Sequence, residues 1–229
     1  MKVQLGKTYL IVPHERKEIA FQHPPFKGNH GNVASQIDEA GLLRPTSMQT
    51  ASLVYDAWKN LNGEYEEQII QILKNAWLLE FTGNLYLPKS NEEINNGVIL
   101  EDNPTIENGK LVMNKDSLVK RLKQGDKKVR FVPFGFKTGI QNLLDFQKNP
   151  YIVARYGEEG AEKIAEVASR YKSNPRIFSF NSVNEETTRM SALNRSWDFD
   201  GRLYVDGDDW DGNWCGRAFG VVPSDDTKK

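Results

Sequence analysis

Glycines divide the last part of the chain into segments too short for an ordinary helix. They recur with only three to five residues between them, at Gly201, Gly207, Gly212, Gly216 and Gly220. Glycine destabilises a helix interior and supplies tight turns. Between the first two, Leu203 and Val205 alternate with Arg202, Tyr204 and Asp206. This period of two predicts a half-buried strand that turns Tyr204 and Asp206 outward, within an end of the chain built from short strands.

Helical periodicity dominates the middle of the chain. Apolar residues lie on one stripe over 53–61 after a capping Thr46 or Ser47, and a second apolar face covers 69–77. The two predict an antiparallel helical hairpin within 46–79 that packs into the core.

Strand and helix patterns then interleave. We expect strands at 8–12, 97–102, 110–113 and 129–136, and helices after Asn114, at 140–146 and at 158–171. This order favours an α+β fold over a doubly wound parallel sheet. No internal repeat is found, so residues 1–229 are expected to form a single domain.

Composition bounds the class of protein. The chain has 229 residues, of which 38% are hydrophobic, and a net charge of -1. These values indicate a globular protein and give no electrostatic footprint for nucleic acid. The single cysteine excludes an internal disulfide. We expect no signal peptide, transmembrane segment or membrane insertion, and a cytoplasmic or virion-associated location.

Most chemical motifs fail on spacing. The "GKT" at 6–8 lacks the upstream glycine of a phosphate-binding loop, and no register of 206–220 fits an EF-hand. Cys215 has no histidine near it in the sequence to activate it. We therefore expect no catalytic residue, metal or cofactor. A calcium site of another kind, built from the clustered carboxylates, stays open as an alternative; its ligands would be Asp206, Asp208, Asp209 and Asp211.

The residue types of the tail are unusual. Residues 191–227 contain no Lys, Glu, Gln, Met, Ile or His, yet hold eight of the fourteen Asp and three of the five Trp. Turn and strand preferences remove some Lys and Glu but do not concentrate Asp and Trp together.

The genetic code describes this bias better. Within 196–220, the only residues whose codons must contain adenine are Asp, Asn or Tyr, each reachable from an Asn codon by changing adenines alone. Cys215 is reachable in the same way. Substitution of adenines, with every other base copied faithfully, would leave this footprint: Asp198, Asp200, Tyr204, Asp206, Asp208, Asp209, Asp211 and Asn213.

The stretch "RSWDFDGRLYVDGDDWDGNWCGRAFGVV" resembles the variable region of proteins diversified by diversity-generating retroelements, most of all those of archaea and their viruses. The resemblance covers about the last 35 residues. It implies a C-type lectin fold, with helical insertions here, whose variable side chains form a ligand-binding surface.

The resemblance implies a binding protein without catalysis and a variable region at about 191–223. The ligand-binding residues would be Cys215 and the eight of the adenine footprint, supported by Trp197, Trp210 and Trp214. The partner would be a protein or cell-surface receptor, and the acidic tail should prefer a basic ligand. Two alternatives remain: an enzyme of the formylglycine-generating type that uses Cys215, and a calcium-dependent carbohydrate binder.

Overall fold

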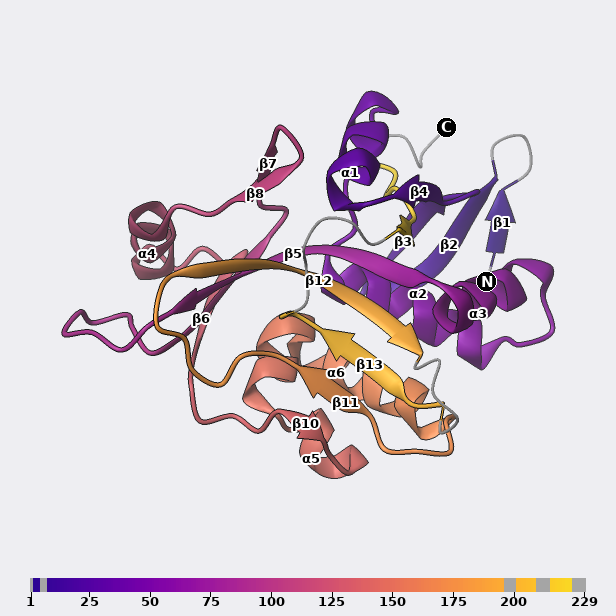
Figure 1. Ribbon diagram of the computed structural model, residues 1–229. Coiled ribbons are helices and arrows are strands. Elements are labelled where there is room, and N and C mark those ends of the chain that lie inside the picture. The colour runs from indigo at the N-terminus through magenta and orange to yellow at the C-terminus, as the bar shows by residue number, and fades with distance from the viewer. Residues whose placement is uncertain (1, 5–7, 196–200, 209–214, 224–229) are drawn as a thin grey trace.

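The computed structural model describes residues 2–4, 8–195, 201–208 and 215–223. It is a mixed α+β structure in which one large sheet runs between helical layers (Figure 1). The helices are α1 (His30–Glu39), α2 (Ser47–Lys59), α3 (Glu64–Asn75), α4 (Lys115–Lys123), α5 (Leu143–Gln147) and α6 (Pro150–Ser169).

Three strands near the N-terminus form a small antiparallel sheet: β1 (Lys2–Gln4), β2 (Tyr9–His14) and β3 (Lys17–Gln22). A separate hairpin pairs β7 (Thr105–Glu107) with β8 (Lys110–Val112). All remaining strands join the large sheet: β4 (Phe26–Gly28), β5 (Trp77–Leu87), β6 (Gly97–Asp102), β9 (Val129–Pro133), β10 (Gly139–Ile140), β11 (Arg176–Phe178), β12 (Thr187–Arg195), β13 (Leu203–Asp206) and β14 (Gly216–Ala218).

The large sheet branches at its longest strand, β5. Along one edge β5 pairs with β12. Along the other it pairs first with β14, at Trp77 and Leu78, and then with β6 from Thr82 onward. One branch continues through β14 to β4 and the other through β6 to β9, while β12 leads on through β13 and β11 to β10. Strand β13 therefore lies between β12 and β11, well inside the sheet.

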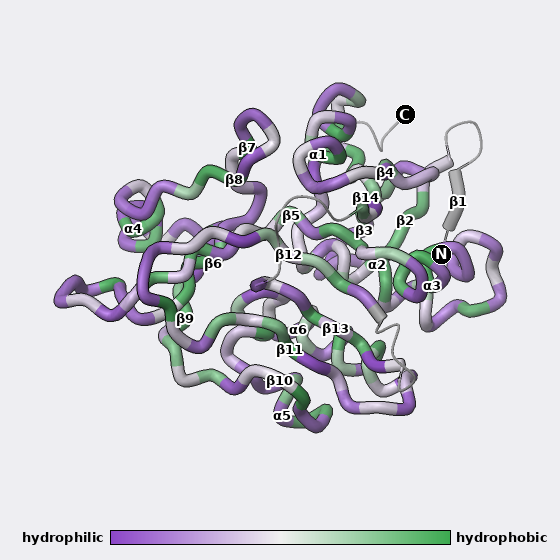
Figure 2. The backbone as a smooth tube through the Cα atoms, viewed as in Figure 1, coloured by the Kyte–Doolittle hydropathy of each residue, from purple (hydrophilic) through white to green (hydrophobic). Residues whose placement is uncertain are grey.

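The main core lies between the sheet and helices α2, α3 and α6. The central rows of β11, β13 and β12 supply Ile177, Val205 and Leu193, each no more than 1% exposed, to this core. A second cluster packs α1 against the opposite face of β5 and β12, and a third packs α4 on β6 and β9. Figure 2 shows β2 and β9 drawn largely as hydrophobic segments, whereas many connecting turns are hydrophilic.

The end of the described chain closes the molecule onto its beginning. Val221 bridges both Phe21 of β3 and Leu43 before α2. Its N–H donates to the Leu43 carbonyl at 2.7 Å, and the Val222 N–H donates to Ala20 at 2.8 Å. These contacts secure the residues that follow the expected variable segment.

Helices α2 and α3 confirm the predicted hairpin, but it ends earlier than expected. The chain leaves the helix at Ala76, which is extended with φ -153°, and Trp77 already begins β5. The expected helix at 140–146 is also displaced: Ile140 belongs to β10, and α5 begins at Leu143.

Helix α6 begins at Pro150, before the predicted 158, and contains a break at Gly157, where φ is 70°. Among the described residues, none of the helices combines the length and apolar character that crossing a bilayer requires.

Candidate ligand-binding surface

Only part of the predicted site lies among the described residues. Tyr204 and Asp206 are in β13, Asp208 follows it, and Cys215 directly precedes β14. Outside the described residues lie Asp198, Asp200, Asp209, Asp211 and Asn213, together with Trp197, Trp210 and Trp214. The site is therefore built here from β13 and the elements that hold it.

The strand predicted at 202–206 is present, and its alternation is as expected for two residues. Leu203 and Val205 are fully buried against the helices. Tyr204 points to the opposite face and is partly exposed. In Figure 1 this outer face of β11 and β13 is turned toward the viewer, with α6 behind it.

Asp206 corrects the sequence prediction, because it is only 4% exposed rather than turned to solvent. Its neighbour across β12 is Ala192, whose side chain packs with Leu79 in the cluster under α1. Asp206 thus lies in a row of the sheet that continues through Ala192 to Leu79, both buried. The Asp206 Oδ1 accepts a hydrogen bond from the Asp208 N–H at 3.2 Å, which is a turn-forming contact.

Tyr204 belongs to a row of residues on the outer face. Arg176 of β11 and Asn194 of β12 are its cross-strand partners. The Tyr204 ring meets the Phe178 ring edge to face, with centroids 5.0 Å apart. The Arg176 guanidinium lies over the Phe178 ring, its carbon 4.4 Å from the ring centroid.

The segment 206–208 is held by its main chain. The Asp206 carbonyl accepts from Arg155 Nη1 at 2.7 Å, and the Gly207 carbonyl accepts from the Tyr86 hydroxyl at 2.7 Å. The Gly207 N–H donates to the Phe178 carbonyl at 2.9 Å, and the Asp208 carbonyl accepts from Arg189 Nε at 3.0 Å. All four anchors precede residue 196. These four contacts therefore do not involve the side chains at 206 and 208, although the Asp208 N–H also donates to the Asp206 side chain.

Position 207 has no room for a side chain. A Cβ at this position would lie 2.0 Å from the Tyr151 hydroxyl oxygen. That oxygen is fixed, since it donates to Asn84 Oδ1 at 2.8 Å. The chain consequently passes directly over the buried polar layer beneath β13.

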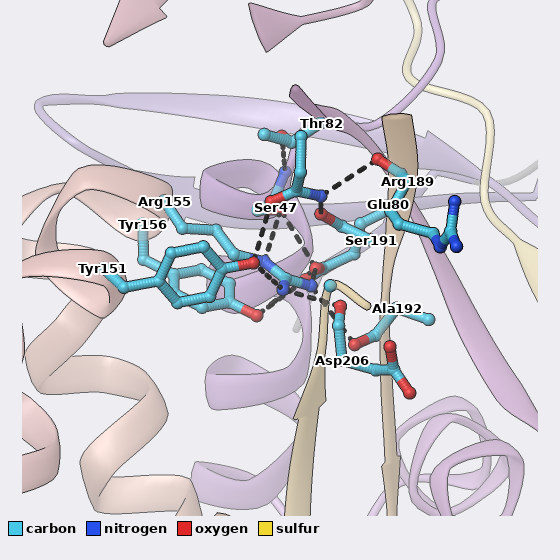
Figure 3. Close-up of polar contacts among 12 residues, drawn as sticks. Ser47, Glu80, Thr82, Tyr151, Arg155, Tyr156, Arg189, Ser191, Ala192 and Asp206 are labelled. Carbon is cyan, nitrogen blue, oxygen red and sulfur yellow. Dashed lines mark hydrogen bonds and ion pairs between the residues drawn. The ribbon is translucent and has the colours of Figure 1, made fainter. Parts of the chain in front are cut away.

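Arg155 is the centre of that layer (Figure 3). It is fully buried, forms an ion pair with Glu80, and donates to Ser47 Oγ at 3.2 Å and to the Ala192 carbonyl at 3.2 Å. Arg155 therefore joins α6 and α2 to the adjacent strands β5, β12 and β13.

Burial and neighbouring charges shift the pKa of several groups in this layer. Burial opposes the charge of Arg155, but Tyr156 and Glu80 outweigh it and raise the guanidinium pKa well above its usual value. Burial likewise raises the pKa of the Tyr156 and Tyr86 hydroxyls well above their usual range, so both remain neutral donors. The two anchors Arg155 and Tyr86 therefore keep their donor hydrogens near neutral pH.

Sequence reasoning missed the anchors Arg155, Tyr86 and Arg189. One signal for the first was available: Arg155 is a lone charge inside the otherwise apolar run 151–156. A charged residue on a buried helix face must have a partner, which could be sought among the acidic residues of predicted strands.

Comparison with known proteins gives one structural likeness. No known family profile matches the chain, and no curated protein matches it. A solved structure described as the accommodation of massive sequence variation in Nanoarchaeota by the C-type lectin fold matches with a TM-score of 0.57. The two are 16% identical, and the match covers 91% of this chain and 100% of the other.

The chain has a C-type lectin fold. This confirms the fold expected from the tail. Within this C-type lectin fold, Cys215 is exposed, and no group of three or more His, Cys, Asp or Glu side chains in the described part of the chain is arranged to hold a metal ion.

Proposed function

We propose that this C-type lectin-fold protein is a non-catalytic binder of a protein or cell-surface receptor. In this proposal its surface is formed by the outer face of β13 and the adenine-footprint residues other than the buried Asp206, and adenine-directed mutagenesis from a retroelement diversifies it. The observation that carries the proposal is the support of 206–208 through main-chain atoms, by residues that all lie outside the footprint.

That support separates stability from recognition. A main-chain hydrogen bond contributes about 1 kcal/mol whatever the side chain, so four of them hold the segment in every variant that keeps the strand. Side chains such as those of Tyr204 and Asp208 can then change without loss of the fold. A stable framework with exchangeable side chains of mixed polarity is what adaptable recognition requires.

The diversification part is tested in the neighbouring DNA. We expect a near-duplicate of the segment encoding 196–220, lying beside a reverse transcriptase gene and differing from it only where the duplicate has adenine. Differences scattered over all four bases would contradict adenine-directed mutagenesis. That result would leave the binding part of the proposal to its own test.

The binding part is tested with a phage-displayed library of random peptides, selected against the purified full chain. We expect the selected peptides to be enriched in Lys and Arg, because the footprint is acidic. The triple variant with Asp208, Asp209 and Asp211 changed to Ala should bind them at least about tenfold more weakly, as expected when charge-assisted contacts are lost. Undiminished affinity would exclude these residues from the surface.

The two alternative functions make different predictions for the same peptides. A binding protein that does not depend on calcium keeps its affinity in excess chelator, and one without thiol chemistry has no activity on a cysteine-containing peptide for Cys215→Ala to abolish. Loss of binding with chelator, accompanied by a lower melting temperature, would favour the calcium-dependent reading. Activity on a cysteine-containing peptide that disappears in Cys215→Ala would favour the enzyme.

A further inference from the structure

The outer face contains a cation that nothing in the described part of the chain neutralises. Arg176 opens β11 beside Tyr204, and its one described contact is the stacking of its guanidinium on Phe178. Its Nε is buried and has no hydrogen-bond partner among the described residues. No ion pair to it occurs there either. Burying part of a charged group without a partner costs free energy that the fold alone does not return.

Other buried or partly buried arginines show what a structural role looks like in this protein. Arg155 pairs with Glu80, and Arg189 donates to two carbonyls. Arg130 also has an unpartnered Nε, but its two terminal nitrogens contact Asp102 at 2.6 and 2.8 Å. Arg176 differs from all of these because its terminal nitrogens have no acceptor in the described chain.

A second unsatisfied atom lies in the same row. Asn194, across β13 from Arg176, is 1% exposed and donates to the Ala76 carbonyl at 2.8 Å, while its Oδ1 has no partner among the described residues. Tyr204 stands between the two, at a position of the adenine footprint. Polar atoms without a hydrogen-bond partner among the described residues therefore lie on both sides of Tyr204, the central residue of the proposed surface.

We infer that Arg176 is a fixed anchor for an acidic side chain of the protein ligand. A guanidinium with its stem side buried presents its terminal nitrogens as a planar fork, which matches a carboxylate. Stacking on Phe178 keeps that fork oriented before the ligand arrives, which lowers the entropy lost on binding. Arg176 lies before the footprint, so every variant of the tail would retain the same anchor. This inference rests on the proposed binding function.

The ligand surface would therefore carry charges of both signs. Arg176, which lies beside the start of β13, would bind an Asp or Glu side chain of the ligand. The acidic footprint would bind basic groups of the ligand. Specificity would change with the footprint, while the carboxylate contact would stay constant and set the register of the ligand on the sheet.

The test uses the phage-displayed random peptides with three forms of the full chain: wild type, Arg176→Gln, and Arg170→Gln as an exposed arginine directly after α6 and outside the surface. Wild type and Arg170→Gln should each select peptides that contain an Asp or Glu at a recurring position. Changing that residue to Asn or Gln should weaken binding about tenfold or more, and should have no effect on Arg176→Gln.

Each outcome is decisive. An acidic preference that persists in Arg176→Gln, or binders without any acidic residue, would overturn the anchor and leave the binding function standing. Failure of the wild type to select any peptide would contradict both. The melting temperature of Arg176→Met without ligand gives a second measurement: it should equal or exceed that of the wild type, and a clear decrease would mean that Arg176 has a structural role.

Discussion

At the scale of single residues, His30 makes stability depend on pH. It begins α1, is 4% exposed, and its Nε2 lies 3.1 Å from the Ser191 carbonyl of β12. Burial lowers its pKa from 6.5 to about 4. Between these values the unfolded chain binds a proton that the folded chain does not. Stability should therefore fall as pH drops from 6.5 toward 4, by on the order of 3 kcal/mol.

Urea unfolding at pH 7 and at pH 4.5 measures this effect in wild type and in His30→Gln. We expect the variant to lose much of the difference between the two pH values. The same substitution at His14 is the matched control. Burial lowers the pKa of His14 too, but its side chain is less enclosed than that of His30. Equal pH dependence in wild type and His30→Gln would show that another group is responsible.

Residue-level prediction from sequence succeeded where a local pattern decides and failed where burial depends on neighbours. The alternation of 203–205 was sufficient to assign two core residues and one outward residue. It failed for Asp206, which is buried in a row shared with Ala192 of β12 and Leu79 of β5, and Leu79 is distant in sequence. A strand period gives the face of a side chain, but not what packs on that face.

At the scale of elements, β13 should tolerate changes at its outward side chains and resist a change in its path. Tyr204→Ser and Asp208→Asn, both within reach of adenine substitution, should alter the free energy of unfolding by less than about 1 kcal/mol. Gly207→Ala should cost about 1–3 kcal/mol, because its Cβ would overlap the Tyr151 hydroxyl. Chemical unfolding of the three variants compares them directly.

Tyr151→Phe offers a control for that contact. Tyr151→Phe removes the oxygen that the new Cβ of Gly207→Ala would overlap. It should therefore cost less free energy of unfolding in the Gly207→Ala background than in the wild type. If the two effects simply add, the overlap is not the cause of the loss.

The ion pair between β5 and α6 should be the most sensitive contact beneath the surface. Arg155→Met leaves Glu80 buried without its cation and removes the donor to the Asp206 carbonyl. We expect a loss of about 3–5 kcal/mol, measured by urea unfolding. Adding Glu80→Gln removes the unpaired buried charge and should restore part of the lost free energy of unfolding. A loss under about 1 kcal/mol in Arg155→Met would contradict the anchoring role.

Sequence predicted the elements whose signals are local. Caps and apolar stripes marked α2 and α4, as Thr46 and Asn114 show. Helix α1 was missed because its apolar set, Val33, Ala34 and Ile37, is short and follows a turn-rich loop. The start of β5 was assigned to α3 because the apolar run 76–79 fits either period, and only pairing with β12 and β14 decides it.

At the scale of the whole molecule, the residues after the footprint complete the core instead of trailing from it. Phe219 and Val221 are 1% and 3% exposed within the main core, and Val221 bridges β3 to the segment before α2. In chain order, the proposed variable segment thus follows β12 and precedes a closing contact with the N-terminal sheet. If the proposed mutagenesis changes this segment, both of its flanks are held by residues outside the footprint.

This closure predicts slow hydrogen exchange near the end of the chain. The amides of Gln22, Val221 and Val222 donate across the closing contact at 2.7–2.8 Å, so they should exchange only through global unfolding, as slowly as amides of β5. Val221→Ala should lower the free energy of global unfolding and should accelerate the exchange of these amides together with that of the β5 amides. Exchange of Val221 and Val222 at the rate of a frayed terminus, with β5 still protected, would mean that the variable segment is held at one end alone.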